Sequence, residues 1–496
     1  MRQLRGEDAR FVYAESGHAN SNITLISIYD PATKAEGRVR FKGLLKHVES
    51  RLHLSPIFRQ KLLRVPLELD FPYWIEDESF DLEYHVRHIA LPKPGDWRQF
   101  CIQASRIHAR PLDLTRPLWE LYLVEGLDSF LDLPPDSFAI LAKIHHAAID
   151  VRGGAEITTL LHDSTAVPPA PEPPEPWFPE SPPGSVSLLT RALVNNVVRP
   201  LMFAGPLTRA LGKVGPAVLG SLGDLWFGNQ RMPVTRFNSE VSPHRVFESR
   251  RFFIDEFKRI RALVPGATIN DAVLAVCGGA LRRYLNAHEE LPRDSLVSLA
   301  PVSVRSEVSG EERPGISLIR VSLGTEIDDP LKRLRAIQKH TSTSEEIEQA
   351  VSAKELTDIS KHAPAATLAL SARLLAGSSL DGGVHEPLAG CTIMNVPGPT
   401  TPLYFDGSRM TYFSAIMPIS DGMGLVFAVT SYDGMIFISP TSCREQLPDP
   451  EFFAQCVRDS FQEYLALADR RPKTRGKRRL KKVVVKRKTT PRKKAA

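Results

Sequence analysis

The sequence predicts an α/β protein made of two lobes of similar size. The chain has 496 residues, which is more than one ordinary hydrophobic core accommodates. Segments with the two-residue period of strands and segments with the 3.6-residue period of helices are mixed in both halves. Nine prolines lie between Pro168 and Pro183, too many for a helix or a central strand. That segment is therefore predicted to be an extended linker.

These observations divide the chain into four parts. We expect an N-terminal lobe over residues 1–165, a linker with apolar helices at the lobe junction over 166–234, a C-terminal lobe over 235–469 and a basic tail over 470–496. Within the linker region, residues 186–228 are apolar with few charges. They suit either helices that cover the junction or a segment that lies at a membrane interface.

In the N-terminal lobe, a short helix is expected near the start and an amphipathic helix at Phe41–Leu52, whose apolar residues share one side. Alternating apolar residues predict the strands. The expected strands are Asn22–Tyr29, Leu121–Val124 and Ser137–Ile144, and a further helix is expected from Trp97 to about Arg110.

In the C-terminal lobe, Thr268 followed by Asp271 has the spacing of a capping box and predicts the start of a helix. Asp433-Gly434 between two alternating apolar runs predicts a tight hairpin. The expected strands are Leu296–Ala300, Leu425–Tyr432 and Met435–Ser439, and the expected helices run from Leu331 to about Glu355 and from Asp449 to Ala468.

The composition is that of a soluble globular protein, with 42% hydrophobic and 24% charged residues. The N-terminus lacks the apolar stretch of a signal peptide, and no run of 18 apolar residues could span a bilayer. The five cysteines are scattered, without the spacing of a zinc site or the need for a disulfide framework. We therefore expect no metal, no cofactor and a cytoplasmic location.

The C-terminal tail differs from the rest of the chain in charge. Residues 470–496 carry 15 Lys or Arg and no acid, and removing these 15 charges from the net +6 leaves −9 on residues 1–469. Such a tail is either solvated and disordered or attracted to an anionic lipid surface, at up to ~1 kcal/mol per basic residue. Nucleic-acid binding is a third, less favoured alternative, because no aromatic residues alternate with the charges.

The candidate site lies at Ile144–Gly154, where a predicted strand ends. His145 and His146 stand there, and Asp150 follows four residues after His146. A neutral imidazole, with an ordinary pKa near ~6.5, can take a proton from a hydroxyl group. The residues alone leave two alternatives open: a structural histidine pair, and a metal site whose third and fourth ligands are not evident. No Gly-x-Ser-x-Gly elbow or Walker loop offers a rival site.

The segment His145–Asp150 matches the HHxxxD signature of CoA-dependent acyltransferases and of peptide-synthetase condensation domains. Further segments resemble motifs of the bacterial wax ester synthase/diacylglycerol acyltransferase family, in the family order and across about residues 5–468. These segments are Phe80–His88, Pro111–Glu120, Thr235–Asn238, Asn270–Asp271, Pro301–Arg305 and Asn395–Pro399.

This resemblance implies two chloramphenicol-acetyltransferase-like lobes with mixed sheets and a central substrate tunnel. Acyl-CoA would enter the tunnel from one side as a substrate, and diacylglycerol or a fatty alcohol from the other. By the same resemblance, His146 is the general base, His145 is a positioning residue, and Asp150 is a structural support that pairs with Arg305. A lipid-synthesising enzyme of this kind would associate peripherally with the inner membrane or with lipid droplets, through its basic tail.

Other residues are candidates for contact with the substrates or the tunnel wall, and each has a structural alternative. The candidates are Asn270, Asp271, Asn395, Pro397 and Gly398. The Asn270-Asp271 pair could instead only cap a helix, and Asn395–Pro399 could form only a rigid turn. Trp119 is expected in the core, and Cys391 is expected to be buried filler, because no charged neighbour would lower its pKa.

Two departures from the family pattern bear on activity. Val151 stands where the family has a glycine, and Ile316 follows Gly315 where the family has Gly-Asn. A β-branched residue disfavours the turn that a glycine permits. Two alternatives to a fully active enzyme therefore remain: a weakly active or inactive relative that binds lipid, and a condensation-type enzyme that uses carrier-protein thioesters.

Overall fold

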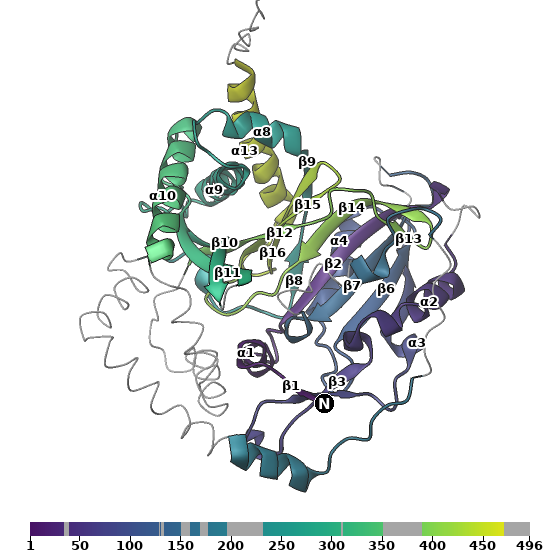
Figure 1. Cartoon of the computed structure of the whole chain (residues 1–496). Coiled ribbons are helices and arrows are strands. Elements are labelled where there is room, and N and C mark those ends of the chain that lie inside the picture. The colour runs from purple at the N-terminus through teal and green to yellow at the C-terminus, as the bar shows by residue number, and fades with distance from the viewer. Residues whose placement is uncertain are drawn as a thin grey trace, which may run out of the picture.

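The computed structural model describes residues 1–33, 39–127, 129, 133–149, 159–168, 177–195, 232–308, 311–350 and 389–470. For Glu7 and for residues 301–318, 343–350 and 397, the description is limited to the backbone. Within these ranges the protein is α/β, with strands and helices mixed in both halves (Figure 1), as predicted from the sequence.

The first lobe is built on a six-stranded sheet in the order β13-β14-β2-β7-β6-β5. Only the β5–β6 pair is parallel; the other neighbours are antiparallel. Its strands are β2 (Asn22–Asp30), β5 (Val86–Ala90), β6 (Trp119–Glu125), β7 (Phe138–His145), β13 (Tyr404–Phe405) and β14 (Ser408–Ile416). Its helices are α1 (Gly6–Tyr13), α2 (Phe41–Glu49), α3 (Leu82–His85) and α4 (Trp97–Ala109).

The second lobe is built on a seven-stranded mixed sheet in the order β11-β10-β12-β15-β16-β8, with β9 also paired to β16. Helix α9 packs against α8, α10 and α13 and is buried over most of its length. The strands are β8 (Arg245–Phe247), β9 (Arg250–Phe253), β10 (Val297–Val308), β11 (Glu311–Ser322), β12 (Cys391–Pro397), β15 (Val426–Tyr432) and β16 (Met435–Cys443). The helices are α8 (Ile254–Arg261), α9 (Ile269–Ala287), α10 (Pro330–Ala350) and α13 (Pro450–Arg470).

Two strands from the C-terminal half belong to the first lobe's sheet. β14 lies antiparallel to β2, with Ser414 opposite Ile26, and β13 extends the same edge. The link continues into the second sheet, because the hydroxyl of Tyr432 on β15 donates to the carbonyl of Met410. The lobe boundaries at 165 and 235 stay a prediction, and the C-terminal range clearly contributes to both sheets.

A third, small sheet carries part of the predicted junction. It consists of β1 (Arg2–Gln3), β4 (Tyr73–Glu76) and β3 (Gln60–Leu63). A helix over 185–195 packs on it, with Leu188 and Ala192 buried against Val65 and Tyr73. The remainder of the apolar stretch, 196–228, lies outside the described residues, as do the prolines of 169–176 and the tail beyond residue 470.

Several sequence predictions are confirmed. The helix predicted from Phe41 is α2, with Leu44 and Val48 buried, and the helix predicted from Trp97 is α4. The hairpin at Asp433-Gly434 joins β15 to β16, and both turn residues have positive φ, as a tight hairpin turn requires. Short 3₁₀ turns complete the fold: η1 (Pro31–Thr33), η2 (Leu52–Leu54), η3 (Pro56–Phe58), η4 (Pro66–Glu68), η5 (His146–Ala148) and η6 (Arg236–Asn238).

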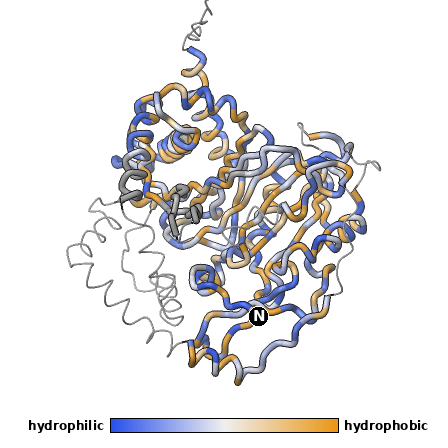
Figure 2. Tube along the Cα trace, in the orientation of Figure 1, coloured by the Kyte–Doolittle hydropathy of each residue, from blue (hydrophilic) through white to orange (hydrophobic). Residues whose placement is uncertain are grey.

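Hydrophobic residues are frequent along the strands (Figure 2), and the buried apolar side chains come from both strands and helices. One large buried cluster fills the first lobe and includes residues of β14, β15 and β16. A second cluster surrounds α9. Across the part of the chain that the structure describes, no helix combines the length and the apolar character needed to cross a membrane.

Candidate active site

The end of β7 positions the histidine pair. β7 is a central strand between β2 and β6 and is buried along its whole length, which explains its nearly continuous apolar sequence. His145 is the last residue of the strand and lies opposite Asn22. His146 begins η5, and its backbone N–H donates to the carbonyl of Ser21 at 2.8 Å. A rigid strand therefore delivers both rings to the lobe's edge.

His145 is fully buried, and both of its ring nitrogens are occupied. Nδ1 accepts a hydrogen bond from the backbone N–H of Ala147 at 3.1 Å. Nε2 donates to Oε1 of Glu15 at 3.2 Å. This network assigns the proton to Nε2 and leaves no lone pair for a substrate. The arrangement supports the positioning role predicted for His145.

His146 has a different environment. Its ring is partly exposed and stacks on Phe11, with the ring centroids 3.7 Å apart and the planes inclined by 18°. Burial lowers the pKa of His146 to about 4, and the positive charge of Arg10 contributes in the same direction. The imidazole is therefore neutral at pH 7, the form that can accept a proton.

The carboxylate residue of the HHxxxD motif is not described by the structure. Asp150 and Val151 lie outside the described residues. Arg305 lies on β10 opposite Pro314, but its side chain is also outside the description. The predicted pairing of Asp150 with Arg305 stays a prediction.

The Asn270-Asp271 segment forms the first turn of α9. Asp271 closes the predicted capping box: its Oδ2 accepts from the backbone N–H of Thr268 at 2.7 Å, and its own N–H donates to the Thr268 hydroxyl at 3.1 Å. Its other oxygen accepts from the hydroxyl of Thr341 at 2.8 Å. The Asp271 carboxylate is buried and bound to protein groups, which favours the capping role over substrate contact. Asn270 is only half-buried.

The Asn395–Pro399 segment ends β12. Asn395 is exposed and lies opposite Val429 on β15. Pro397 is the last residue of the strand. Gly398 packs so closely on β15 that a Cβ atom would collide with the carbonyl oxygen of Ser431. Only glycine allows this approach, so at least Gly398 has a packing role. A tunnel-lining role for the segment stays a prediction.

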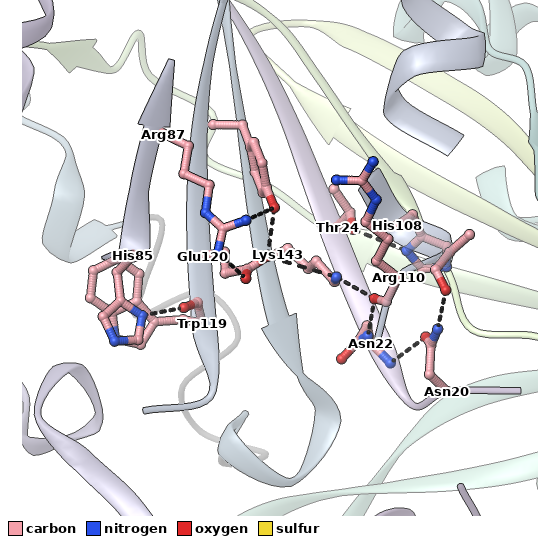
Figure 3. Close-up of polar contacts among 12 residues, drawn as sticks. Asn20, Asn22, Thr24, His85, Arg87, His108, Arg110, Trp119, Glu120 and Lys143 are labelled. Carbon is pink, nitrogen blue, oxygen red and sulfur yellow. Dashed lines mark hydrogen bonds and ion pairs between the residues drawn. The ribbon is translucent and has the colours of Figure 1, made fainter. Parts of the chain in front are cut away.

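A buried polar network connects β7, the strand that carries the histidine pair, to the neighbouring strands β6 and β5 (Figure 3). This network was not predicted from the sequence. Lys143 on β7 is fully buried, donates to the carbonyl of Arg110 and lies 3.8 Å from Glu120. Glu120 also accepts from Arg87 at 3.1 Å and from the hydroxyl of Tyr122 at 2.7 Å. Lys143 is the one charged residue in an otherwise apolar strand. Because a buried charge requires partners, this lysine could have indicated the network from the sequence.

The described residues also bear on two other kinds of chemistry, metal binding and thiol nucleophiles. Among the described residues, no group of three or more His, Cys, Asp or Glu could hold a metal ion. Burial raises the pKa of the Cys391 thiol to about 12, so the nucleophilic thiolate is scarce at neutral pH. Trp119 is buried, and its indole N–H donates to the carbonyl of Phe58 at 3.0 Å, which confirms its prediction as a core residue.

Two lobes with mixed sheets and a histidine pair at the end of a central strand agree with the arrangement expected of an HHxxxD acyltransferase. Comparison with known proteins specifies the family. The wax ester synthase/diacylglycerol acyltransferase catalytic domain matches residues 4–273, and the C-terminal domain of the same family matches residues 315–464. The chain therefore belongs to the wax ester synthase/diacylglycerol acyltransferase family and is an acyltransferase of that family.

Individual relatives agree with this assignment. A Mycobacterium tuberculosis protein, provisionally named a diacylglycerol O-acyltransferase, is 30% identical over 95% of this chain and 92% of its own length. The O-acyltransferase WSD of Acinetobacter baylyi is 31% identical over 76% of this chain and 79% of its own. The solved wax ester synthase/diacylglycerol acyltransferase of Marinobacter aquaeolei is similar in fold, with a TM-score of 0.68, 23% identity and coverage of 95% of this chain and 100% of that one.

Proposed function

We propose that this chain transfers an acyl group from acyl-CoA to the hydroxyl of diacylglycerol or a fatty alcohol and so forms triacylglycerol or wax ester. The observation that carries the proposal is the neutral, partly exposed imidazole of His146 at the end of β7. The names of the family and of its solved Marinobacter member support both acceptors. A condensation domain of similar fold, with a TM-score of 0.52, was solved with C8-CoA, which supports a CoA thioester as donor.

The proposed reaction uses one imidazole and the two substrates. His146 accepts the hydroxyl proton as the acceptor oxygen attacks the thioester carbonyl carbon. The carbon–sulfur bond then breaks, and the proton passes from His146 to the CoA thiolate. One ester forms, one thioester is lost, and the proton is returned, so the step balances without a covalent acyl-enzyme.

A second candidate is a weakly active relative that binds lipid without efficient turnover. Two observations favour it. Val151 replaces the family's glycine directly after the motif's carboxylate. In addition, a base with a pKa of about 4 has a low affinity for protons, and general-base catalysis is most efficient with a pKa near the working pH.

One assay separates these candidates. Release of CoA is followed with a thiol reagent, using long-chain acyl-CoA with diacylglycerol or a fatty alcohol. We expect turnover by the wild type and a loss of about 10²–10⁴-fold in kcat for His146→Ala. His88→Ala is the matched control, because His88 is exposed on β5 and pairs with Glu125. Equal CoA release by wild type and His146→Ala would contradict the proposal, and activity only with acyl-carrier protein would indicate a condensation-type enzyme.

The proposal includes peripheral attachment to an anionic membrane or to lipid droplets. Apolar side chains are exposed near the small sheet, where the helix over 185–195 packs. Leu67 is 86% exposed and has a left-handed backbone, and Leu193 on that helix is 64% exposed. Exposed apolar residues of this kind are typical of membrane or partner contact, and the tail could add electrostatic attraction.

Sedimentation with anionic vesicles tests the attachment. Deletion of residues 470–496 should weaken binding strongly at low salt, because each basic residue near the surface contributes up to ~1 kcal/mol. Leu193→Gln should weaken binding further and in a salt-independent manner, because it removes apolar contact without adding a charge. Unchanged sedimentation of both variants would contradict peripheral attachment but would leave the acyl transfer proposal untouched.

A further inference from the structure

We propose that the N-terminal segment from Phe11 to Ser21 is a positioning clamp for the histidine pair, in which Phe11 sets the ring plane of His146 and Glu15 fixes His145. The inference rests on the proposed role of His146 as the base. None of these residues belongs to a motif recognised in the sequence. The clamp is formed by the last part of α1 and the loop that leads into β2.

Ser21 ties the clamp together. Its hydroxyl donates to the carbonyl of Phe11 at 2.9 Å, and its carbonyl accepts from the backbone N–H of His146 at 2.8 Å. One residue therefore fixes the distance between the C-terminal part of α1 and the start of η5. These two elements are also in direct contact.

Phe11 acts on the ring of His146. Nδ1 of His146 is buried and has no hydrogen-bond partner among the described residues, so within that part of the chain the flat contact with Phe11 orients the ring. The lone pair of an imidazole nitrogen lies in the ring plane. A stacked partner on the face of the ring therefore fixes its plane and leaves the in-plane direction open to a hydroxyl group.

Glu15 acts on the neighbouring histidine. Its Oε1 accepts from the backbone N–H of Ser21 at 2.9 Å and from Nε2 of His145 at 3.2 Å. The other nitrogen of His145 accepts from Ala147, which lies within η5. The chain Glu15–His145–Ala147 thus holds the turn that begins with His146. A carboxylate that accepts from one ring nitrogen fixes the tautomer and the ring orientation of a histidine.

The loop of the clamp is also attached to the second lobe. His18 lies 3.0 Å from Asp421, and the carbonyl of His18 accepts from the guanidinium of Arg245 at 2.7 Å. The clamp is therefore held at both ends: by β2 and β7 in the first lobe and by these contacts in the second. A rigid support matters, because a misplacement of about 1 Å can cost about 10²-fold in rate.

The first test measures the kinetics of three variants of the full chain. Phe11→Leu keeps much of the apolar volume but removes the flat ring, and Phe11→Tyr restores it. We expect kcat to fall about 10–100-fold for Phe11→Leu, with KM for acyl-CoA changed less than about twofold and Phe11→Tyr close to wild type. Phe41→Leu is the matched control. Phe41 also stacks on a histidine ring, that of His88, with the two ring centroids 5.6 Å apart, and His88 is not part of the histidine pair.

A second readout does not depend on turnover. Modification by diethylpyrocarbonate requires a neutral imidazole, and trypsin should release both histidines in the peptide Ile144–Arg152, where fragmentation distinguishes them. The charged or titratable groups that act on His146 are Arg10 of α1 and His145 of β7. In Phe11→Leu the ring gains solvent, so its modification profile should shift toward the ordinary pKa of about 6.5. Glu15→Leu, which removes the acceptor for Ser21 and His145, should leave this profile in place and lower kcat.

The outcomes are distinguishable. A folded Phe11→Leu variant with wild-type kcat and an unshifted His146 profile overturns the clamp, as does an equal loss in Phe41→Leu. If Phe11→Leu does not fold, Glu15→Leu decides, because it removes the oxygen that accepts from Ser21 and His145, and wild-type kcat there overturns the clamp. If His146→Ala is as active as the wild type, the proposed function fails, whereas an inactive His146→Ala beside a fully active Phe11→Leu refutes only the clamp.

Discussion

A large cation is buried in each lobe, and the two are held in different ways. Lys143 in the first lobe is paired with the carboxylate of Glu120 and with a backbone carbonyl. Arg333 in the second lobe is held by the carbonyls of Ile327 and Asp328 and by the hydroxyl of Tyr464. The first cation depends on an opposite charge, whereas the second depends on the geometry of five N–H donors.

The difference follows from what each cation supports. Lys143 is two residues before His145 on the strand that carries the histidine pair, and burial lowers its pKa to about 8. Arg333 connects the start of α10 to α13 and packs closely against Gly279 of α9. The stability that Lys143 confers should therefore depend on pH and on the carboxylate of Glu120. The stability that Arg333 confers should depend on its hydrogen bonds to backbone carbonyls.

The largest effect is expected for Glu120→Ala. This variant leaves Lys143 and Arg87 without their shared carboxylate, and breaking a buried pair from one side costs about 3–5 kcal/mol. Urea unfolding measures the loss. Glu125→Ala is the control on the same strand, because Glu125 pairs with His88 in an exposed position and should change stability by less than about 1 kcal/mol. Equal effects of the two variants would show that the network beneath β7 does not stabilise the lobe.

Arg333→Lys is expected to have the next largest effect, a loss of about 2 kcal/mol. A lysine ammonium cannot reproduce the fork of N–H donors that reaches Ile327 and Asp328, so buried carbonyls lose partners at about 1–3 kcal/mol. Arg335→Lys on the exposed face of α10 is the control. Thermal unfolding compares the two, and an unchanged Tm for Arg333→Lys would remove the distinction drawn between the lobes.

The secondary structure could be predicted from the sequence, whereas the long-range strand pairing could not. The strands β2, β7, β15 and β16 and the helices α2, α4, α9 and α13 follow from local periodicity and capping, which act within a few residues. The position of the histidine pair was predicted from the end of the strand that precedes it. The pairing of β14 with β2, by contrast, joins residues almost 400 positions apart, and no local pattern encodes such a partner.

The same reasoning applies within the site. Asp271 was correctly assigned to a cap, because Thr268 stands three residues before it. Phe11, Glu15 and Ser21 were missed, because each is unremarkable in its own segment and acquires its role only through contact with β7 and η5. Lys143 could have been found, since a lone charge in an apolar strand indicates a buried partner.

The two buried cations should also differ in how the free energy of unfolding depends on pH. Lys143 has a pKa of about 8 when folded and about 10.4 when unfolded, so between these values the unfolded chain binds more protons. The free energy of unfolding should then rise with pH from about 8 to 10, by on the order of 1–2 kcal/mol, and this contribution is lost as the pH falls through 8. Lys143→Met should abolish the rise. Arg335→Lys, at an exposed position of α10, should retain it, and a wild-type profile in Lys143→Met would show that another group titrates.

The most local contrast between the two cations comes from two matched removals of a tyrosine hydroxyl. Tyr122→Phe deletes a hydrogen bond of 2.7 Å to the Glu120 carboxylate, and hydrogen bonds to charged groups contribute about 1.5–3 kcal/mol. Tyr464→Phe deletes a contact of 3.5 Å with Arg333, at the limit of hydrogen-bond length, and should cost less than about 1 kcal/mol. Unfolding of both variants in urea measures the difference. A larger loss for Tyr464→Phe would mean that the tyrosine, rather than the two carbonyls, holds the second cation, and the contrast between a charge-paired and a carbonyl-bound cation would have to be redrawn.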